Sequence, residues 1–302
     1  MNKIKMEILP NDDFPIVGIG ASAGGLKEFE VFLSNFSPEF PISLILVQHL
    51  DPTSESNLRN ILRNYTSFNI YQAENDVKIQ KNTIYVIPPN KKILVKNKKI
   101  FIEDFDVDKV KRLTIDYLFR SLAEDLKEKS IGILLSGTGT DGTLGLRKIK
   151  GEGGMAMVQD PDTTRYNGML ESAINNIVVD YILPTEIMPE KLIEYIKTIY
   201  GKLEKHREFS EKNIQEPLDK IFDIIRSYMG HEFSAYKNTT ILRRIERRMT
   251  VNQINSLDNY IKYLIVNEDE IYKLSHELLI GVTGFFRDQE TFGAFEKKVV
   301  PQ

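Results

Sequence analysis

The chain contains no cysteine, so it can form no disulfide, no zinc–thiolate site and no thiol nucleophile. Long hydrophobic runs are lacking as well. The N-terminal segment has no apolar signal-peptide core, and no stretch reaches transmembrane length. Neither sign of charge is in excess, since the net charge is −3 over 302 residues. We therefore expect a cytoplasmic protein without membrane insertion and without a nucleic-acid partner.

The stretch Phe14-Pro-Ile-Val-Gly-Ile-Gly-Ala-Ser22-Ala-Gly-Gly25 is the most informative part of the chain. An apolar run ends in small residues, with one serine among glycines. This pattern is typical of a strand-to-helix turn at the carboxyl edge of a parallel sheet. Ser22 would then lie at the head of the next helix, as in a nucleophile elbow, although Gly-x-Ser-x-Gly itself is absent.

Two further strand patterns bring a histidine and an acid to the same edge. Only four histidines occur, and the one in the first two hundred residues is His49, which follows the apolar run 42–48. The run 130–136 leads into Gly137-Thr-Gly-Thr-Asp141-Gly. Serine, histidine and aspartate at the ends of three strands can form a hydrolytic triad, in which the imidazole takes the serine proton and the carboxylate orients the imidazole.

Each of these features has a plainer interpretation. An edge serine is commonly a helix cap, a lone histidine a solvated side chain, and Asp-Gly a turn. A phosphate site is another alternative, because Gly18-Ile-Gly20-Ala-Ser-Ala23 fits the Gly-x-Gly-x-x-Ala pattern of dinucleotide folds. That pattern expects an acid at the end of the second strand, where this chain has Gln48-His49, so the dinucleotide reading is disfavoured but stays open.

Through about residue 200 the chain alternates apolar strands with amphipathic helices, which predicts an α/β fold with a doubly wound, mainly parallel sheet. We expect strands at 15–20, 42–48, 83–87, 131–136, 155–159 and 177–182. We expect helices at 25–35, 55–64, 113–127, 142–150 and 189–200. The segments 83–95 and 99–102 indicate an antiparallel β-hairpin excursion, with Asn97-Lys98 as its turn.

After residue 200 the pattern changes. Residues 201–216 are densely charged and lose apolar periodicity, which indicates a linker between a domain at 1–200 and a small all-α domain at 217–302. Helices are expected there at 217–229, 238–251, 255–266, 268–279 and 287–298. The helix around residues 239–250 has two faces, with Ile241, Leu242, Ile245 and Met249 on one and Arg243, Arg244, Arg247 and Arg248 on the other.

Residues 14–200 resemble the CheB-type chemotaxis protein-glutamate methylesterases. The motifs that carry the resemblance occur in family order and spacing: Ile-Gly-Ala-Ser22-x-Gly-Gly, Val-Gln-His49, Tyr85-Val-x-Pro-Pro, Gly137-x-Gly-x-Asp141-Gly, Gly153-Gly and Gln159-Asp. The resemblance implies that Ser22 is the nucleophile, His49 the general base and Asp141 the orienting acid. The implied reaction is hydrolysis of glutamate methyl esters, with glutamine deamidation beside it, on the cytoplasmic methylation helices of chemoreceptors.

The oxyanion and substrate contacts are expected at Ala23, Gly24, Thr138 and Gly139. Ala23 stands where the family often has threonine, and Thr138 where it has methionine, so both positions keep a backbone amide while the side chain changes. Neither a metal nor a cofactor is expected for the esterase reaction. An alternative is a degenerate adaptor that docks on receptors without catalysis, and the two departures leave room for it.

The helical tail resembles the N-terminal domain of CheR-type receptor methyltransferases. Tyr236-Lys-x4-Leu-Arg-Arg-x-x-Arg-Arg-Met249 and Val282-Thr-Gly-Phe-Phe-Arg-Asp288 carry this resemblance. It implies a partial S-adenosylmethionine site at Thr283 and Arg287, and no methyl transfer unless a further C-terminal domain holds the cofactor. It also implies that the arginine face of 239–250 docks the acidic methylation segment of the receptor.

Overall fold

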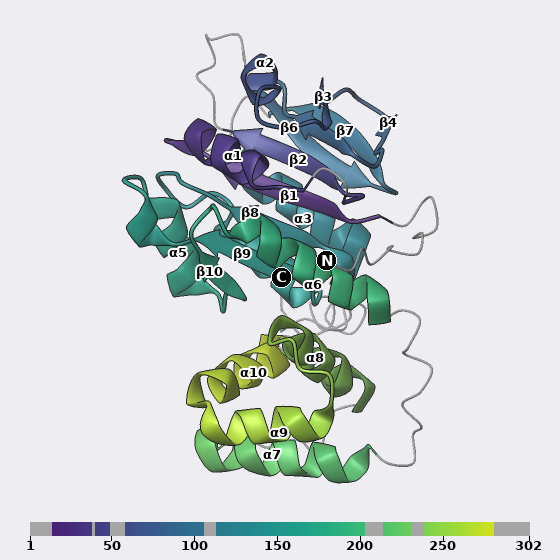
Figure 1. The fold of residues 1–302 in the computed structure, drawn as a ribbon, viewed down its shortest axis with the longest axis vertical. Helices are drawn as coiled ribbons and strands as arrows, with labels where there is room; N and C mark the ends of the chain where they lie inside the picture. Colours follow the sequence, from purple (N-terminus) through teal and green to yellow (C-terminus); the bar gives the residue numbers. More distant parts are fainter. Residues whose placement is uncertain are drawn as a thin grey trace, which may run out of the picture.

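The computed structural model describes residues 14–37, 40–48, 58–105, 113–202, 214–230 and 238–280, which form an α/β domain followed by a helical domain (Figure 1). The expected fold class is confirmed, including the mainly parallel sheet, the hairpin excursion and the helical tail. His49, Thr283, Arg287 and the expected helix at 287–298 lie outside the described residues.

The main sheet has the strand order β10-β9-β8-β1-β2-β5-β3, and all its pairings are parallel. Its strands are β1 (Ile16–Ala21), β2 (Ser43–Gln48), β3 (Asn69–Gln72), β5 (Thr83–Val86), β8 (Ile131–Leu134), β9 (Met155–Gln159) and β10 (Tyr181–Leu183). All of β1 is buried, as expected for a strand covered on both faces. Because β1 pairs with β2 and β8, the ends of these three strands lie side by side.

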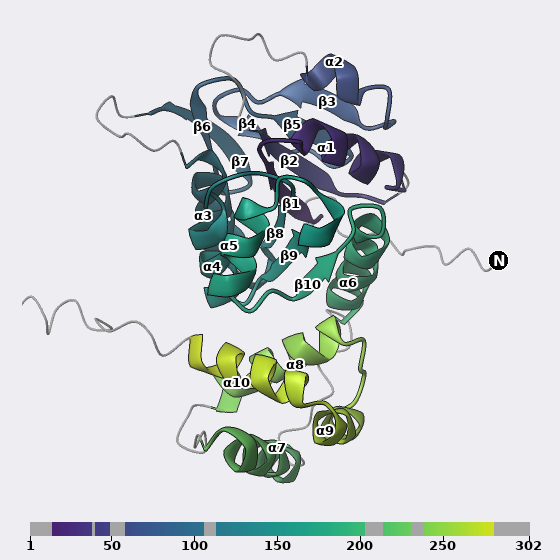
Figure 2. The ribbon, with the colours of Figure 1, turned by 90° about the vertical axis from the view of Figure 1, so that its left-hand side faces the viewer.

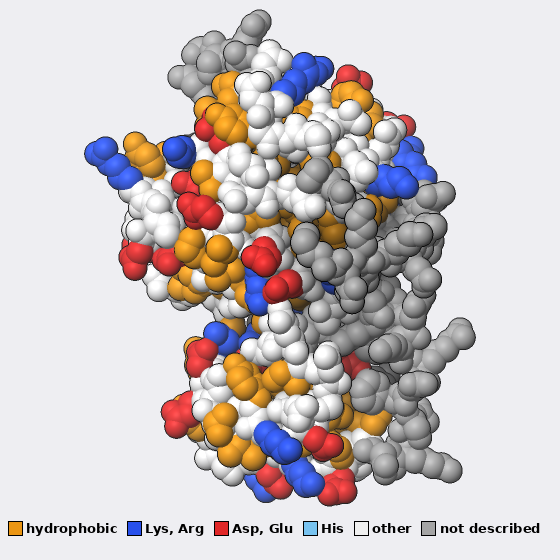
Figure 3. All heavy atoms as spheres, in the orientation of Figure 1, with side chains coloured by type: hydrophobic (Ala, Val, Ile, Leu, Met, Phe, Trp, Pro, Cys, Tyr) orange, Lys and Arg blue, Asp and Glu red, His pale blue; other side chains and the backbone are white. Residues whose placement is uncertain are grey.

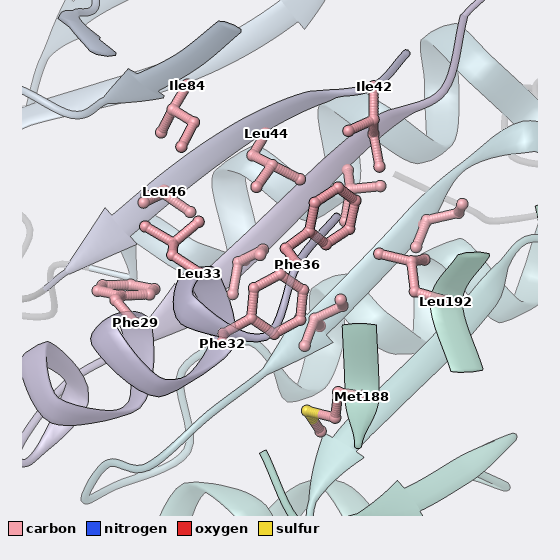
Figure 4. Close-up of a cluster of buried hydrophobic side chains, with 14 of the residues drawn as sticks. Phe29, Phe32, Leu33, Phe36, Ile42, Leu44, Leu46, Ile84, Met188 and Leu192 are labelled. Carbon is pink, nitrogen blue, oxygen red and sulfur yellow. The ribbon is translucent and has the colours of Figure 1, made fainter. Parts of the chain in front are cut away.

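Helices cover both faces of the sheet (Figure 2). One face carries α1 (Gly25–Ser34), α2 (Leu58–Leu62) and α6 (Met188–Lys202). The other carries α3 (Thr114–Leu126), α4 (Thr143–Gly151) and α5 (Gly168–Asn176). In the first layer, the α1 residues Phe29 and Phe32 and the nearby Phe36 meet strand and α6 side chains, including Leu44, Leu46, Ile84, Met188 and Leu192 (Figure 4).

A small antiparallel sheet of β4 (Val77–Lys78), β7 (Lys99–Asp104) and β6 (Lys91–Lys96) packs on α3 through Ile93, Val95 and Ile100. Asn97 and Lys98 both have φ of 54°, which is the left-handed backbone that a two-residue type I′ turn requires. The predicted hairpin turn is confirmed. Two short 3-10 turns, Lys127–Lys129 and Pro161–Thr163, complete the connections.

The helical domain contains α7 (Gln215–Met229), α8 (Asn238–Val251), α9 (Leu257–Val266) and α10 (Glu268–Ile280) around a core of its own. The apolar stripe of α8 is confirmed, because Ile241, Ile245 and Met249 are buried in that core. α8 and α10 lie next to the α/β domain, while α7 and α9 lie on the far side (Figures 1 and 2). No helix within the described ranges is long and apolar enough to cross a membrane.

Several elements differ from the sequence-based expectations. α5 was not expected, and β10 begins at Tyr181 instead of residue 177. The short strands β3 and β4 were also not expected. Of the helix expected at 55–64, residues 55–57 lie outside the described ranges, and α2 ends at Leu62 instead of residue 64.

Candidate active site

Ser22 occupies the sharp turn between β1 and α1. Its amide donates to the Ser136 carbonyl at 2.8 Å, and its own carbonyl accepts the Gly25 amide at 2.9 Å. Gly24, the N-cap of α1, has a φ of 78°, a left-handed conformation that strains residues with a side chain. These bonds fix the serine backbone between the ends of β1 and β8. The expected strand-turn-helix placement of Ser22 is therefore present.

Gly137 follows β8 and lies directly against Ser22. A Cβ at position 137 would be 2.8 Å from Ser22 Cβ and 2.5 Å from Met169 Sδ. The Gly137 amide donates to the Tyr166 carbonyl at 2.8 Å, and its carbonyl accepts the Met169 amide at 3.0 Å. Only glycine allows this close approach, so the loop after β8 is held against the serine turn.

Ser136 is a supporting residue that the sequence did not single out. Its hydroxyl donates to the Ala23 carbonyl at 2.7 Å and lies 2.9 Å from Thr164 Oγ1. Its amide donates to Gln159 Oε1 at 2.9 Å. Ser136 therefore connects the turn that carries Ser22 to the ends of β8 and β9. In the sequence, its position directly before Gly137 could have indicated this supporting role.

Asp141 is buried, with 3% of its surface exposed, and both carboxylate oxygens accept backbone amides. Oδ2 accepts Ile115 N, and Oδ1 accepts Asp116 N and Gly142 N, each at 2.9 Å. Ile115 and Asp116 are in the first turn of α3, and Gly142 is the N-cap of α4. The amino-terminal ends of two helices therefore surround the carboxylate and hold it by backbone hydrogen bonds.

Gly18 and Gly20 allow α3 to reach Asp141. A Cβ at position 18 would lie 2.6 Å from Leu122 Cδ1, and a Cβ at position 20 would lie 2.3 Å from Ile115 Cγ2. Both glycines are inside β1 and face α3, so they serve helix–strand packing. The alternative in which they form a phosphate-binding turn is wrong.

A second buried carboxylate, Asp116, lies beside Asp141. Asp116 Oδ1 accepts the Gly145 amide at 2.6 Å, which ties the start of α3 to α4. Burial raises the pKa of Asp116; the Gly145 hydrogen bond lowers it in part, and the nearby negative charge of Asp141 raises it again. Asp116 thus helps to hold the helix start that supports Asp141.

The expected oxyanion donors come from two loops at this edge. Within the described residues, the backbone amides of Ala23, Gly24, Thr138 and Gly139 have no hydrogen-bond acceptor. Thr138 and Gly139 are exposed, and Gly139 has a φ of 90°. The start of α5 packs against this loop, since a Cβ at Gly168 would be 3.5 Å from Gly139 N. These amides are available to a ligand that approaches Ser22.

The placement of β2 bears on His49 although this histidine is outside the described residues. Gln48, the last residue of β2, is in register with Ala21, the last residue of β1. The chain therefore leaves β2 beside the turn that carries Ser22. Across the described part of the chain, no group of three or more His, Asp or Glu side chains could hold a metal ion.

The arginines of α8 do not form a single solvent-facing surface. Arg247 and Arg248 are 7% and 1% exposed and form ion pairs inside the protein. Arg244 is partly buried and donates to the Glu277 carbonyl, whereas Arg243 is exposed. The expected receptor-docking face is therefore wrong for Arg247 and Arg248. On the face shown in Figure 3, acidic and basic side chains are interspersed over both domains.

Comparisons with known proteins identify relatives of both domains. Residues 17–192 match the CheB methylesterase family, and residues 216–279 match the all-alpha domain of CheR methyltransferases. A candidate protein-glutamate methylesterase/protein-glutamine glutaminase of Leptospira interrogans is 35% identical over 184 residues, which cover 60% of this chain and 94% of that protein. The protein-glutamate methylesterase/protein-glutamine glutaminase of Thermotoga maritima is 32% identical over 185 residues, or 60% of this chain and 54% of that protein.

The crystal structure of the Thermotoga maritima CheB methylesterase catalytic domain aligns with a TM-score of 0.56 at 32% identity, covering 60% of this chain and 98% of that chain. An uncharacterised 104.1 kDa protein of Rhodobacter capsulatus is 29% identical over 263 residues, which are 80% of this chain but only 28% of that protein. The chain thus spans a minor part of the Rhodobacter protein and about half of the Thermotoga protein. With its CheR-type all-alpha domain behind the esterase-like domain, the chain belongs to the CheB methylesterase family.

Proposed function

We propose that the α/β domain hydrolyses glutamate methyl esters on the cytoplasmic helices of chemoreceptors, and that glutamine side chains are its second substrate class. Ser22 is the nucleophile, His49 the general base and Asp141 the orienting acid. One observation carries the proposal: Ser22 is fixed on a glycine-lined turn at the sheet edge that also holds the buried Asp141 carboxylate. The names of the relatives support the same substrate class.

In the proposed reaction, Ser22 Oγ attacks the ester carbonyl carbon while the His49 imidazole takes the serine proton. The tetrahedral intermediate collapses, the C–O bond to the methoxy group breaks, and the imidazolium returns its proton to the leaving methanol. Water then attacks the glutamyl-serine ester, with His49 as base, and releases the glutamate carboxyl group and free Ser22. From a glutamine side chain the leaving group is ammonia.

The transition-state charge would be stabilised by backbone amides. Ala23 lies beside the nucleophile, and Thr138 and Gly139 lie in the loop that Gly137 brings against Ser22. A well-placed amide donor stabilises a developing oxyanion by about 3–4 kcal/mol. Because the donors are main-chain groups, the alanine and threonine at positions 23 and 138 do not remove them.

Asp141 would act through His49. Three amide hydrogen bonds from the starts of α3 and α4 hold the carboxylate in place, so it can orient the imidazole and stabilise the imidazolium. Replacing Asp141 with asparagine would retain the shape and remove the charge. We expect Asp141→Asn to lower kcat strongly and to leave substrate binding nearly unchanged.

Methanol release from a methylated receptor fragment tests the proposal. Triad members act as a unit, so Ser22→Ala and His49→Ala should each lower kcat by about 10⁴-fold or more. Ser34→Ala is the matched control, because Ser34 is an exposed serine at the end of α1. A Ser22→Ala protein that keeps a tenth of the rate would exclude Ser22 as the nucleophile.

A fluorophosphonate probe separates the esterase from a degenerate receptor-docking adaptor. Labelling requires an activated hydroxyl, so the unmodified chain and Ser34→Ala should react, and Ser22→Ala should not. Absence of labelling at Ser22 together with tight receptor binding would favour the adaptor.

The esterase reaction as proposed uses no cofactor. Partial S-adenosylmethionine binding by Thr283 and Arg287 stays a prediction, because both residues lie outside the described ranges. We propose that without a further cofactor-holding domain this chain transfers no methyl group and binds S-adenosylmethionine weakly or not at all. Calorimetric titration with S-adenosylmethionine is the test, and micromolar binding or any methyl transfer to receptor glutamates would contradict it.

A further inference from the structure

Six buried charged side chains lie where the helical domain meets the α/β domain. The α/β domain contributes Lys150 and Asp180, and the helical domain contributes Arg247, Arg248, Glu270 and Glu277. We call this set the interdomain charge cluster. It contains three cationic and three anionic groups, so its formal charges balance, and each member is at most 8% exposed.

Arg247 is the central residue of the cluster. Its Nη2 pairs with Asp180 and donates to the Gly154 carbonyl at 2.6 Å, and its Nε donates to the same carbonyl at 3.0 Å. Its Nη1 lies 2.5 Å from Glu277 Oε1. A single side chain of α8 thus binds a carboxylate and a carbonyl of the α/β domain together with a carboxylate of α10.

Two further ion pairs cross the domain boundary, Lys150–Glu277 and Arg248–Asp180. Lys150 Nζ, on α4, lies 2.7 Å from Asp180 Oδ1 and 3.3 Å from Glu277 Oε2. Arg248 Nη1 lies 3.2 Å from Asp180 Oδ1, while its other nitrogens hold Glu270 at 2.9 and 2.5 Å. Every charge therefore has an opposite partner, as buried charges require.

Contacts at the side of the cluster extend the interface. The Tyr181 hydroxyl donates to the Val251 carbonyl at 2.8 Å, and Gln253 Nε2 donates to Glu194 Oε2 at 2.5 Å. The Val251 side chain is buried among residues of the α/β core. The interface thus combines ionic, polar and apolar contacts.

The interface lies at the amino edge of the main sheet. Gly154 directly precedes β9, Asp180 directly precedes β10, and Lys150 is in the last turn of α4. Ser22 and Gly137 follow β1 and β8, at the opposite, carboxyl edge. In both ribbon views the helical domain lies next to β10 and α6 (Figures 1 and 2).

We propose that the buried arginine face of α8 binds the esterase domain of the same chain, not an external acidic helix, and holds the helical domain on the amino edge of the sheet. The groups that recognise this face are a buried carboxylate, Asp180, and the backbone carbonyl of Gly154. A receptor helix would have to break these contacts before it could reach Arg247 or Arg248. The inference is independent of the esterase reaction.

The acid–base properties of the cluster are consistent with permanent pairing. Burial alone would raise the pKa values of Asp180 and Glu277, but the attraction of Arg247 and Lys150 outweighs it and lowers both. Both carboxylates are therefore charged at neutral pH. Removing Arg247 would leave two buried carboxylates short of a partner, which favours separation of the domains and hydration of the cluster.

The distance between two spin labels, one in each domain, tests the proposal in the full chain. Because the chain has no cysteine, Asn175→Cys on α5 and Lys262→Cys on α9, both at exposed positions, give specific labelling. A docked domain gives one narrow distance distribution. We expect Arg247→Ala and Asp180→Asn to lose it and to give a broad distribution.

Arg243→Ala is the matched control, since Arg243 is an exposed arginine on the same helix. It should keep the narrow distribution. Asp180→Asn keeps the test decisive if Arg247→Ala does not fold, as judged by circular dichroism. A broad distribution in the unmodified chain, or an unchanged narrow one in the folded Arg247→Ala and Asp180→Asn variants, would overturn the proposal.

Binding of a glutamate-rich helical peptide gives an independent readout. If α8 is an intramolecular contact, Arg247→Ala does not weaken binding of this peptide relative to Arg243→Ala. A loss of peptide affinity that is specific to Arg247→Ala, while the domains remain docked, would show that the face binds an external acidic helix after all.

Discussion

Gly20→Ala probes how β1 supports the candidate site from inside the core. The new Cβ would lie 2.3 Å from Ile115 Cγ2, 2.9 Å from Cγ1 and 3.0 Å from Cδ1. Carbon atoms prefer separations of about 3.5–4.0 Å, so Ile115 would have to move by about 1 Å. Ile115 is completely buried, and such overpacking costs about 1–3 kcal/mol of unfolding free energy.

The same displacement reaches Asp141, because the Ile115 amide donates to Asp141 Oδ2 at 2.9 Å. We therefore expect Gly20→Ala to lower the proposed esterase activity as well as the urea midpoint of unfolding. Gly168→Ala is the control. A Cβ there meets its nearest atom at an ordinary 3.5 Å, so this change should be close to neutral.

A second substitution identifies the clash as the cause. Ile115→Ala removes all three clashing carbons but alone leaves a cavity, at a cost of about 2–5 kcal/mol. In the double variant the new methyl at position 20 fills part of that cavity. The loss of unfolding free energy in the double variant, measured with urea, should then be about 1–3 kcal/mol smaller than the sum of the two single losses. Additive costs, or equal effects of Gly20→Ala and Gly168→Ala, would refute close packing of α3 on β1.

Two further predictions concern the serine turn and the interdomain charge cluster. Gly24→Ala should lower activity more than stability, because it forces a side chain into a φ of 78° and places a Cβ 2.8 Å from Ser136 Oγ. The control is Gly230→Ala, which has a φ of 70° but no atom within 4 Å of the new Cβ. Its thermal unfolding therefore measures the cost of the backbone conformation alone. In the interdomain charge cluster, folding lowers the pKa values of Asp180 and Glu277. Their ion pairs therefore stabilise the docked domains fully above the unfolded-state pKa values of about 4, and this stabilisation is lost as the pH falls further. Label distances measured against pH should show domain separation only in that acid range, and separation near pH 6 would contradict the assignment.

Local patterns in the sequence were enough to predict most of the secondary structure of the α/β domain. β1, β2, β8 and β9 are apolar runs that end in small or polar residues, and Asn97-Lys98 has the turn chemistry of a two-residue hairpin. α5 was missed because Gly168–Asn176 is short and begins with glycine. The apolar residues before Tyr181 were assigned to β10, although Val179 packs in the α3-side core before the strand begins.

The candidate site could be predicted in part, and the domain interface could not. Ser22 and Asp141 were found because each follows an apolar strand at the same sheet edge. Ser136 was missed because its role depends on the Ala23 carbonyl, 113 residues away in sequence. Arg247 was assigned to a receptor-docking face because periodicity shows that a helix face is charged but not what covers it, and its partner Asp180 is 67 residues away.

The central position of β1 has a consequence for how the chain is made. β1 emerges first during synthesis, yet one of its two neighbours, β8, follows more than a hundred residues later. Until β8 has left the ribosome, one edge of an entirely buried strand lacks its hydrogen-bonding partner, and such long-range pairing forms slowly. The early nascent chain therefore has an unpaired edge on β1, and it does not yet contain Asp141. Once β9 and β10 have joined the sheet, the later-emerging α8 can dock at the amino ends of these two strands.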